Sequence, residues 1–363
     1  MSNQTLAVKY RPRDWEDLTE QEYIKVILEN QIATNSVKNA YLFTGPAGTG
    51  KTTSARIFAN KINEGNGQPI EVDAASNNGV DQIRTIIDDA KFKPLDSNYK
   101  IYILDEVHML SIGAWNAMLK LLEEPPKTTI FILCTTDPQK IPKTILSRVQ
   151  RYDFQKISLD GIVKRLEYII EQENAQILKS KYKENPNLAD EDCIVTQKEA
   201  LQYIAKVSEG GMRDAISSLD KCLSFSNQVT IENVVKALGI SDYGVLHGLL
   251  HNILENHTKE AINNIENVYG QGKDLKLFIK QFIQFILDVC KYQLYNSYDY
   301  IQIPNTINLQ EYNNFDYDTL LEILDEIINL SNQIKYEQNP RILVESKILL
   351  LCKGDEVNAN AKI

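Results

Sequence analysis

The sequence of 363 residues predicts an α/β domain, built around a mostly parallel sheet, that is followed by helical domains. Two observations lead to this prediction. Short β-rich segments alternate with helix-like segments between about residues 35 and 155, which is the pattern of βα units. After about residue 157 the β-rich segments disappear and amphipathic helices replace them. A chain of this length can bury two or three separate hydrophobic cores.

Four segments of the first domain are expected to be strands, because they are rich in β-branched and aromatic residues. They are residues 40–44, 69–75, 100–105 and 129–136. The segment SIGAWNAMLKLLEEPP, at residues 111–126, places apolar side chains at helical spacing and ends in two prolines. It predicts a helix that stops at those prolines.

The helical part contains the polar segment KSKYKENPNLADEDC at residues 179–193, which is typical of a surface loop. A last helical region begins near Ser241, and the chain ends in the polar sequence KGDEVNANAKI. These changes of pattern predict three domains, at residues 1–157, 158–240 and 241–363.

The composition excludes several classes of protein. No segment approaches the roughly 18 continuous apolar residues of a membrane span, and the first residues lack the apolar core of a secretory signal. The five cysteines are widely scattered, which predicts a reducing, cytoplasmic compartment without disulfides or paired-cysteine metal sites. The formal charge of -10 argues against a chain that coats DNA by itself, although a local cluster of cations could still bind nucleic acid.

The segment GPAGTGKT, at residues 45–52, matches the phosphate-binding loop of P-loop nucleotidases and lies between an expected strand and an expected helix. Its glycines allow backbone amides to face phosphate oxygens, and the helix N-terminus adds its dipole. We expect Lys51 to contact the β- and γ-phosphates and Thr52 to bind Mg²⁺. A glycine-rich turn that matches by chance is the alternative. The expected nucleotide-binding residues of the loop are Gly45, Pro46, Ala47, Gly48, Thr49, Gly50, Lys51, Thr52 and Thr53.

Two adjacent acids end the strand IYILDEVH. Asp105 is expected to bind Mg²⁺, and Glu106 to activate the water that attacks the γ-phosphate. The alternative is a solvated strand end. Because the phosphate-binding loop lies upstream in the same α/β pattern, the sequence predicts hydrolysis of ATP as well as its binding. His108 follows the two acids and is expected to support the local turn.

Two further residues are expected near the γ-phosphate. Thr136 ends the next strand and could orient the attacking water, although a threonine that only caps the strand is a competing interpretation. Arg213, in GGMRDA, lies near a helix start and could reach ATP from the helical domain; the alternative is a surface arginine. The segment TTDPQKIPKTILSRVQRYDF contains Ser147 and Arg148, and no carboxylate lies within four residues of Arg148. The negative charge that Arg148 meets is therefore expected elsewhere.

Seven motifs in this order closely resemble the gamma/tau family of bacterial DNA polymerase III clamp-loader subunits, which are AAA+ ATPases. They are KYRPRDWEDLTEQEYI, GPAGTGKTTSARIFA, DAASNNGVDQIR, DEVHML, LLEEPP, TTDPQKIPKTILSR and GGMRDAISSLD. The likeness covers about residues 5 to 225. The resemblance implies a RecA-like ATPase domain at residues 1–157, an all-helical lid at 158–240 and an all-helical collar at 241–363.

The resemblance also implies a role in DNA replication. Delta-like and delta-prime-like subunits and copies of this chain would form a ring of about five. ATP binding would open a sliding clamp and grip primer-template DNA, and hydrolysis would release the clamp on DNA. In the family the Ser-Arg motif crosses a subunit boundary, so Arg148 is expected to stabilise charge on a neighbour's ATP. An arginine paired within its own domain is the alternative.

The resemblance assigns two further groups of residues. The motif positions that line the adenine pocket in the family are Tyr10, Arg11, Pro12 and Gln21. The motif positions that begin a helix facing the DNA backbone in the family are Asn77 and Asn78, and Arg84 lies further along that helix. For the second group, a solvated helix face is an equally good interpretation of the sequence.

The chain departs from the family pattern in several places. Relatives usually carry a four-cysteine zinc module after the phosphate-loop helix, whereas NKINEGNGQPIEV fills that gap here, so no zinc is expected. Val149 replaces the usual cysteine after Arg148, and no long tau-type extension is expected beyond the collar. The missing zinc module is what a phage-encoded or otherwise reduced version would show. His247, His251 and His257 lack ligand partners at metal-binding spacing, so no metal is expected there.

Two other functions remain alternatives. One is an ATPase-inactive structural subunit similar to delta-prime, against which the intact loop and the two acids argue. The other is a different AAA+ DNA motor, such as a branch-migration helicase, or a protein remodeller. Such motors need a translocating pore loop with an aromatic residue, and the sequence contains no convincing one.

Overall fold

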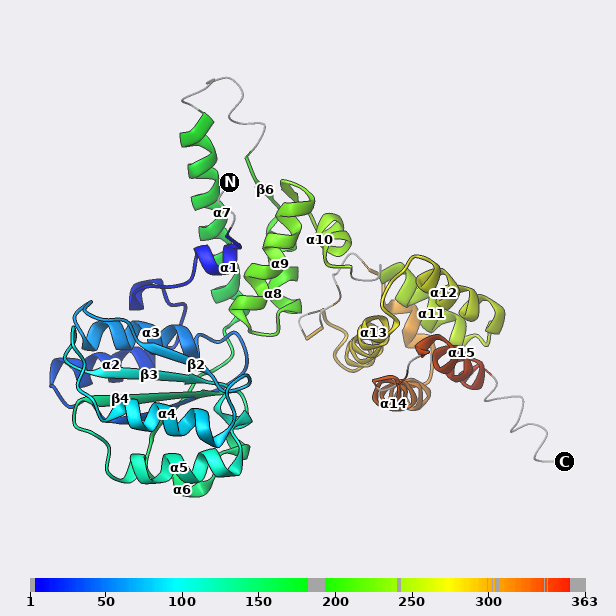
Figure 1. Cartoon of the computed structure of the whole chain (residues 1–363). Coiled ribbons are helices and arrows are strands. Elements are labelled where there is room, and N and C mark those ends of the chain that lie inside the picture. The colour runs from blue at the N-terminus through cyan, green and yellow to red at the C-terminus, as the bar shows by residue number, and fades with distance from the viewer. Residues whose placement is uncertain are drawn as a thin grey trace. The chain divides into compact units, whose positions relative to one another are not determined.

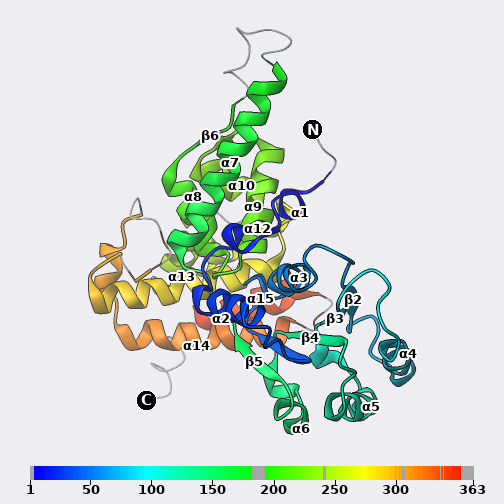
Figure 2. The ribbon, with the colours of Figure 1, turned by 90° about the vertical axis from the view of Figure 1, so that its left-hand side faces the viewer.

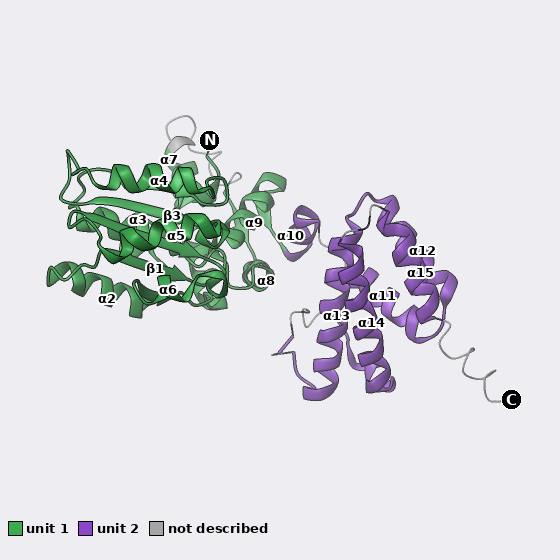
Figure 3. Cartoon of the chain, turned by 60° about the horizontal axis from the view of Figure 1, so that its bottom comes forward, with its two compact units in different colours: residues 1–230 green, residues 231–363 purple. Residues whose placement is uncertain are grey.

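The computed structural model describes residues 4–352, except for 182–192, 240–242, 299, 302, 304–306, 336 and 338. The chain forms two compact units, residues 1–230 and 231–363 (Figure 3). Of the expected surface loop at 179–193, residues 182–192 lie outside the described part, and the polar C-terminal sequence lies outside it as well.

A five-stranded, fully parallel sheet forms the centre of the first unit (Figure 1). Its strand order is β2-β3-β4-β1-β5. The four expected strands are confirmed, and β5 is an addition. Only Tyr152 of β5 is buried, so this edge strand has no apolar run that would reveal it in the sequence. The strands are β1 (Ala40–Thr44), β2 (Ile70–Asp73), β3 (Lys100–Asp105), β4 (Thr129–Thr135) and β5 (Gln150–Asp153).

Helices cover both faces of this sheet (Figure 1). Side chains alternate along β1, so Tyr41 and Phe43 face one layer while Ala40 and Leu42 face the other. Helices α2 and α3 pack on the first face, and α4, α5 and α6 pack on the second. The helices are α2 (Glu22–Ala33), α3 (Lys51–Ile62), α4 (Val80–Ala90), α5 (Ile112–Glu123) and α6 (Lys143–Leu146), and the short turn η2 is Val107–Met109.

The rest of the first unit is helical except for one short strand pair. Figures 1 and 2 show α7, α8 and α9 side by side, and α1 packs against α9. The parallel pair β6–β7 adds strands to a part expected to be all-helical; two residues per strand are too few to produce a sequence pattern. These elements are α1 (Leu6–Lys9), α7 (Leu159–Lys181), β6 (Val195–Thr196), α8 (Lys198–Val207), α9 (Met212–Phe225) and β7 (Gln228–Val229).

The second unit is helical in its described residues, and α13 supplies much of its core through Phe278, Phe282 and Phe285. Burial of each such side chain stabilises the unit by about 1.5–3 kcal/mol. In the described part of the chain, no helix combines the length and the apolar character that crossing a membrane requires. The helices are α10 (Ile231–Leu238), α11 (Tyr243–Leu254), α12 (Thr258–Gly270), α13 (Leu275–Tyr295), α14 (Tyr317–Ile334) and α15 (Pro340–Leu351).

Asp288 is a fully buried acid of this second core, and its replacement tests the core's polar contacts. Its carboxylate accepts hydrogen bonds from the Gln284 side chain at 2.7 Å and from the Ile303 backbone N–H at 3.1 Å. Asp288→Ala would leave buried donors without this acceptor, so we expect a loss of about 1–3 kcal/mol in the unit's unfolding free energy. Thermal unfolding of the full chain would measure it. Asp325→Ala, at an exposed site, is the matched control and should change little; equal shifts in both variants would contradict the prediction.

Candidate functional site

The phosphate-binding loop connects β1 to α3 at the carboxyl edge of the sheet, and it requires glycine at specific positions. Gly45 has φ +141°, and a Cβ atom placed on it would lie 2.4 Å from the Phe154 carbonyl oxygen. Gly48 also has positive φ, at +73°. Only glycine adopts these conformations without strain, and they turn the backbone of the loop inward.

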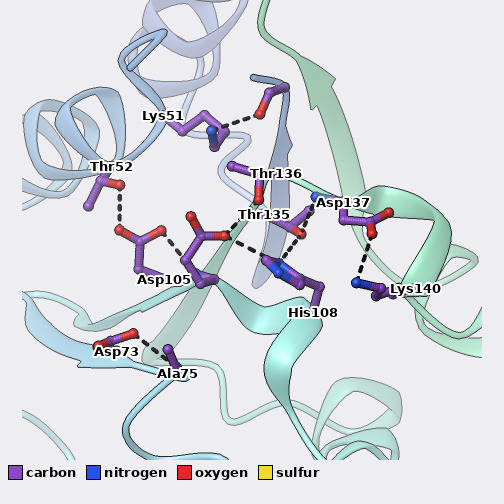
Figure 4. Close-up of polar contacts among 12 residues, drawn as sticks. Lys51, Thr52, Asp73, Ala75, Asp105, His108, Thr135, Thr136, Asp137 and Lys140 are labelled. Atoms are coloured by element: carbon purple, nitrogen blue, oxygen red, sulfur yellow. Dashed lines mark hydrogen bonds and ion pairs between the residues drawn. The ribbon is translucent and has the colours of Figure 1, made fainter. Parts of the chain in front are cut away.

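Lys51 begins α3 and points back into this loop (Figure 4). It is 6% exposed, and its Nζ donates hydrogen bonds of 2.8 Å to the carbonyl oxygens of Gly45 and Pro46. Burial lowers the pKa of Lys51, while the carboxylates of Glu106 and Asp105 act in the opposite direction. A buried ammonium group at the helix N-terminus that follows a glycine-rich loop fits the phosphates of a nucleotide.

Thr52 and Asp105 come from α3 and β3 and face each other (Figure 4). The Thr52 hydroxyl donates to Asp105 Oδ2 at 2.7 Å, and the Glu106 N–H donates to Asp105 Oδ1 at 3.0 Å. A hydroxyl and a carboxylate oxygen are the hard ligands that Mg²⁺ prefers. The pair fits the metal that accompanies a bound nucleoside triphosphate.

Glu106 lies in a left-handed backbone conformation, with φ 49° and ψ 43°. A non-glycine residue held in this region costs about 1–3 kcal/mol and often marks a functional position. Thr136 donates to Glu106 Oε2 at 3.0 Å, and His108 Nδ1 lies 3.2 Å from the same oxygen. Thr135 Oγ1 lies 3.1 Å from that His108 nitrogen (Figure 4).

The structure therefore brings Thr136 onto Glu106, beside the expected metal ligands. The contact between His108 and Glu106 was missed by the sequence analysis, which expected His108 to support the local turn. No signal for this contact was present in the sequence, because the contact depends on the left-handed backbone conformation of Glu106, which a glutamate seldom adopts.

The loop is also in close contact with the start of α9. The Met212 N–H donates to the Gly48 carbonyl oxygen at 3.0 Å, and a Cβ atom on Gly48 would lie 3.0 Å from the Gly211 Cα. Two glycines, one from each segment, permit this approach. It brings Arg213, the second residue of α9, next to the loop, where its backbone nitrogen lies 3.4 Å from the Cβ position of Gly48. The role expected for Arg213 stays a prediction.

The expected adenine-pocket residues make contacts to different elements. The Tyr10 hydroxyl donates to Glu173 of α7 at 2.6 Å, and burial raises the pKa of Tyr10. Burial lowers the pKa of the Arg11 guanidinium, and the nearby charges of Arg56 and Arg213 act in the same direction. Pro12 is half-buried.

The Gln21 side chain pairs with the Gln155 backbone, at 2.8 Å to its oxygen and 3.2 Å from its nitrogen. These contacts attach the N-terminal segment to α7 and to the residues after β5. A role of this segment in binding adenine stays a prediction.

The residues expected to face DNA lie at the start of α4. The Asn77 side chain donates to the Asp73 carbonyl oxygen at 3.0 Å, whereas Asn78 is exposed. Arg84 is exposed and lies 3.4 Å from Asp81. This placement fits both interpretations of the sequence, so the role in DNA binding stays a prediction.

Arg148 follows α6 and forms an ion pair inside the first unit. Its Nη2 lies 2.6 Å from Oε1 of Glu123, which ends α5, and its Nη1 donates to the Thr144 carbonyl oxygen at 2.5 Å. The two side chains of the ion pair are 32% and 50% exposed. The chain thus provides a carboxylate for Arg148 that is distant in sequence, and action on a neighbour's nucleotide stays a prediction.

The described residues contain no group of three or more His, Cys, Asp or Glu side chains placed to hold a metal ion. In the second unit His247 pairs with Glu311, and its ring stacks on that of His251 with centroids 6.2 Å apart. His257 precedes α12 at its N-cap position.

Family models and known sequences of DNA polymerase III subunits match this chain. The family model "DNA polymerase III, delta subunit" matches residues 65–158, and "DNA polymerase III subunits gamma and tau domain III" matches residues 229–316. The chain is 37% identical to the DNA polymerase III subunit tau of Bacillus subtilis, over 99% of this chain and 65% of that protein. It is 31% identical to the subunit gamma of Buchnera aphidicola subsp. Schizaphis graminum, over 85% of this chain and 86% of that protein.

The chain covers only part of several other relatives. It is 31% identical to the Escherichia coli subunit tau over 81% of this chain, and the match spans 46% of that protein. Among solved structures, a lysine-to-arginine variant of Thermotoga maritima RuvB aligns with a TM-score of 0.50 at 17% identity. That alignment covers 68% of this chain and 80% of RuvB, and it concerns the fold alone.

The pairing of Thr52 with Asp105 predicts how binding of ATP depends on magnesium. Asp105→Asn keeps an acceptor for the Thr52 hydroxyl but removes the negative charge that a divalent cation requires. We expect chelation of Mg²⁺ to weaken ATP binding at least tenfold in the wild type and to have little effect in the variant. Titration with a fluorescent ATP analogue, with Mg²⁺ or with EDTA, measures both.

Asp73→Asn is the matched control, because Asp73 ends the neighbouring strand β2 in register with Asp105. This control should keep the magnesium dependence of the wild type. Unchanged magnesium dependence in Asp105→Asn would refute the assignment.

Proposed function

Because the chain belongs to the gamma/tau family of DNA polymerase III subunits and has an AAA+ fold, we propose that it is an ATP-hydrolysing clamp-loader subunit. The substrate is ATP, with Mg²⁺ as cofactor. ATP binding opens a sliding clamp on primer-template DNA, and hydrolysis releases it there during replication. The observation that carries the proposal is the meeting of Thr52, Asp105, Glu106 and Thr136 beside the phosphate-binding loop.

In the proposed mechanism, each residue of the site has a separate role. Lys51 neutralises charge on the β- and γ-phosphates through an ammonium group that is already directed into the loop. Thr52 and Asp105 would hold Mg²⁺, which would supply positive charge close to the transferred phosphoryl group. Glu106 takes the proton from the attacking water, and Thr136 fixes the orientation of that carboxylate.

The two oxygens of the Glu106 carboxylate differ in their contacts, and this difference supports the roles proposed above. Thr136 and His108 both contact Oε2, whereas Oε1 makes no hydrogen bond within the described residues. The side chain is also 37% exposed, so water can reach it. One oxygen is thus held by the protein and the other is available to a water molecule. An ATPase-inactive subunit similar to delta-prime would not need this arrangement.

Arg148 is proposed to act on the ATP of a neighbouring subunit in a ring of about five, formed with delta-like and delta-prime-like subunits and copies of this chain. The guanidinium would exchange Glu123 for phosphate oxygens at the subunit boundary. Both groups are partly exposed, so this ion pair contributes at most about 1 kcal/mol, and the exchange costs little.

The remaining assignments follow from family membership. Residues 1–157 are proposed as the ATPase domain, 158–240 as the lid and 241–363 as the collar that holds the ring. Arg213 would contact ATP from the lid, which the close approach of Gly48 and Gly211 supports. The segments with Tyr10 and Asn77 would contact adenine and the DNA backbone, respectively.

Steady-state ATP hydrolysis tests this proposal. The full chain would be measured alone and in a complex reconstituted with partner subunits, a sliding clamp and primed DNA. We expect clamp and DNA to stimulate hydrolysis, and Arg148→Ala to lower the stimulated rate by at least about 10³-fold, because arginine fingers contribute roughly 10³–10⁵. ATP binding should survive, since Arg148 acts on another subunit's nucleotide.

Arg151→Ala is the matched control, because Arg151 is an exposed arginine three residues further along, paired with Asp153. It should keep the stimulated rate. If the wild type and Arg148→Ala hydrolyse ATP at equal rates that clamp and DNA do not stimulate, Arg148 has only a structural role and the clamp-loader assignment is wrong.

A further inference from the structure

We infer that His108 is a positioning residue for ATP hydrolysis, which fixes the carboxylate of Glu106 and links it to Thr135 at the end of β4. The inference rests on the proposed function. It goes beyond that function because it assigns a role, and a proton position, to a histidine that the proposed mechanism mentions only as a contact.

The first observation is the geometry at Glu106. Its Oε2 lies 3.2 Å from His108 Nδ1 and 3.0 Å from the Thr136 hydroxyl. One contact comes from the turn η2 and the other from the residue after β4. If Thr136 were the only partner, the carboxylate could rotate about that single hydrogen bond. The second contact, from His108 to the same oxygen, restricts this rotation. Two anchors on Oε2 keep Oε1 in a fixed direction.

The second observation concerns the proton on the histidine ring. A carboxylate only accepts hydrogen bonds, so a favourable contact with Glu106 requires a proton on Nδ1. Thr135 Oγ1 lies 3.1 Å from the same nitrogen and accepts a hydrogen bond from the Asp137 N–H at 3.0 Å. With a proton on Nδ1, both neighbouring oxygens can act as acceptors. With a proton only on Nε2, the Nδ1 lone pair would face the carboxylate, which is unfavourable.

The third observation is that the ring is shielded and its position is fixed by the backbone. The His108 side chain is only 13% exposed, so water competes little for Nδ1. The left-handed conformation of Glu106 leads directly into η2, which is closed by a hydrogen bond of 3.0 Å from the Met109 N–H to the Glu106 carbonyl oxygen. This turn brings two side chains that are two residues apart to the same side.

The geometry also limits what His108 does. Its Nδ1 contacts the oxygen of Glu106 that Thr136 already holds, not the oxygen that is left for water. His108 therefore acts through Glu106 and does not take the proton from water itself. Its loss should lower kcat and leave ATP binding unchanged, because within the described residues its polar contacts are with Glu106 and Thr135, outside the phosphate-binding loop.

Three substitutions of His108, made in the full chain and assayed in the reconstituted complex with clamp and primed DNA, test the inference. Asparagine carries its amide nitrogen close to the position of Nδ1, whereas glutamine carries it near Nε2. We expect His108→Ala and His108→Gln to lower kcat ten- to a hundredfold, since small misplacements of a catalytic group have effects of this size. His108→Asn should recover most of the rate. KM and ATP binding should stay within about twofold in all three.

A second measurement does not depend on hydrolysis. Nitrogen chemical shifts of the His108 imidazole in the wild-type chain should show the form protonated on Nδ1, and Glu106→Ala should shift the population toward the Nε2-protonated form. If hydrolysis fails in the wild type while the Nδ1 proton is present, the proposed function is wrong and the contact of His108 with Glu106 stands.

Three outcomes would overturn the inference itself. The first is an unchanged kcat in His108→Ala when the wild type is active. The second is a loss of kcat that asparagine and glutamine restore equally, or that comes with weaker ATP binding, because either indicates a general structural role. The third is an Nε2-protonated ring in the wild type.

Discussion

Thr52 and Asp105 are 53 residues apart and meet through a hydrogen bond of 2.7 Å, and most of the site depends on the constraint that allows this. All strands of the five-stranded sheet run in the same direction, so the residues that end β1, β3 and β4 emerge at one edge. Three groups are consequently neighbours: the phosphate-binding loop, the acids Asp105 and Glu106, and the threonines Thr135 and Thr136. A reversed strand at the centre would send one of these groups to the opposite edge, about 15–20 Å away at roughly 3.3 Å per residue.

The sequence predicted those parts of the fold that short-range patterns encode. Strands β1, β3 and β4 are continuous apolar runs because helices cover both of their faces, and such runs are visible without a structure. The strand β5 has one buried residue and β6 and β7 have two residues each, so the same patterns do not reveal them. The motifs likewise pointed to Lys51 and Asp105 as residues of one site, and their roles there stay predictions.

Contacts between distant segments were not accessible in this way. Glu123 and Arg148 pair across 25 residues because α5 and α6 pack on the same face of the sheet. Gly211 approaches Gly48 because neither carries a side chain, and a glycine in a sequence does not reveal which backbone will approach it. The contact of His108 with Glu106 depends on a single left-handed residue. In each case the missing information was the backbone path, since the residue types themselves were known.

The segment from Leu6 to Leu18 contacts two different layers of the first unit, which makes it a poor place to attach a label. Its start is attached to the helices of the first unit, since the Leu6 N–H donates to Asp220 of α9 and Lys9 pairs with Glu173 of α7. Its end is inserted in the core that covers the sheet, where Trp15 and Leu18 are buried. A fluorophore, affinity label or spin probe in this stretch would therefore report on, and disturb, two layers at once.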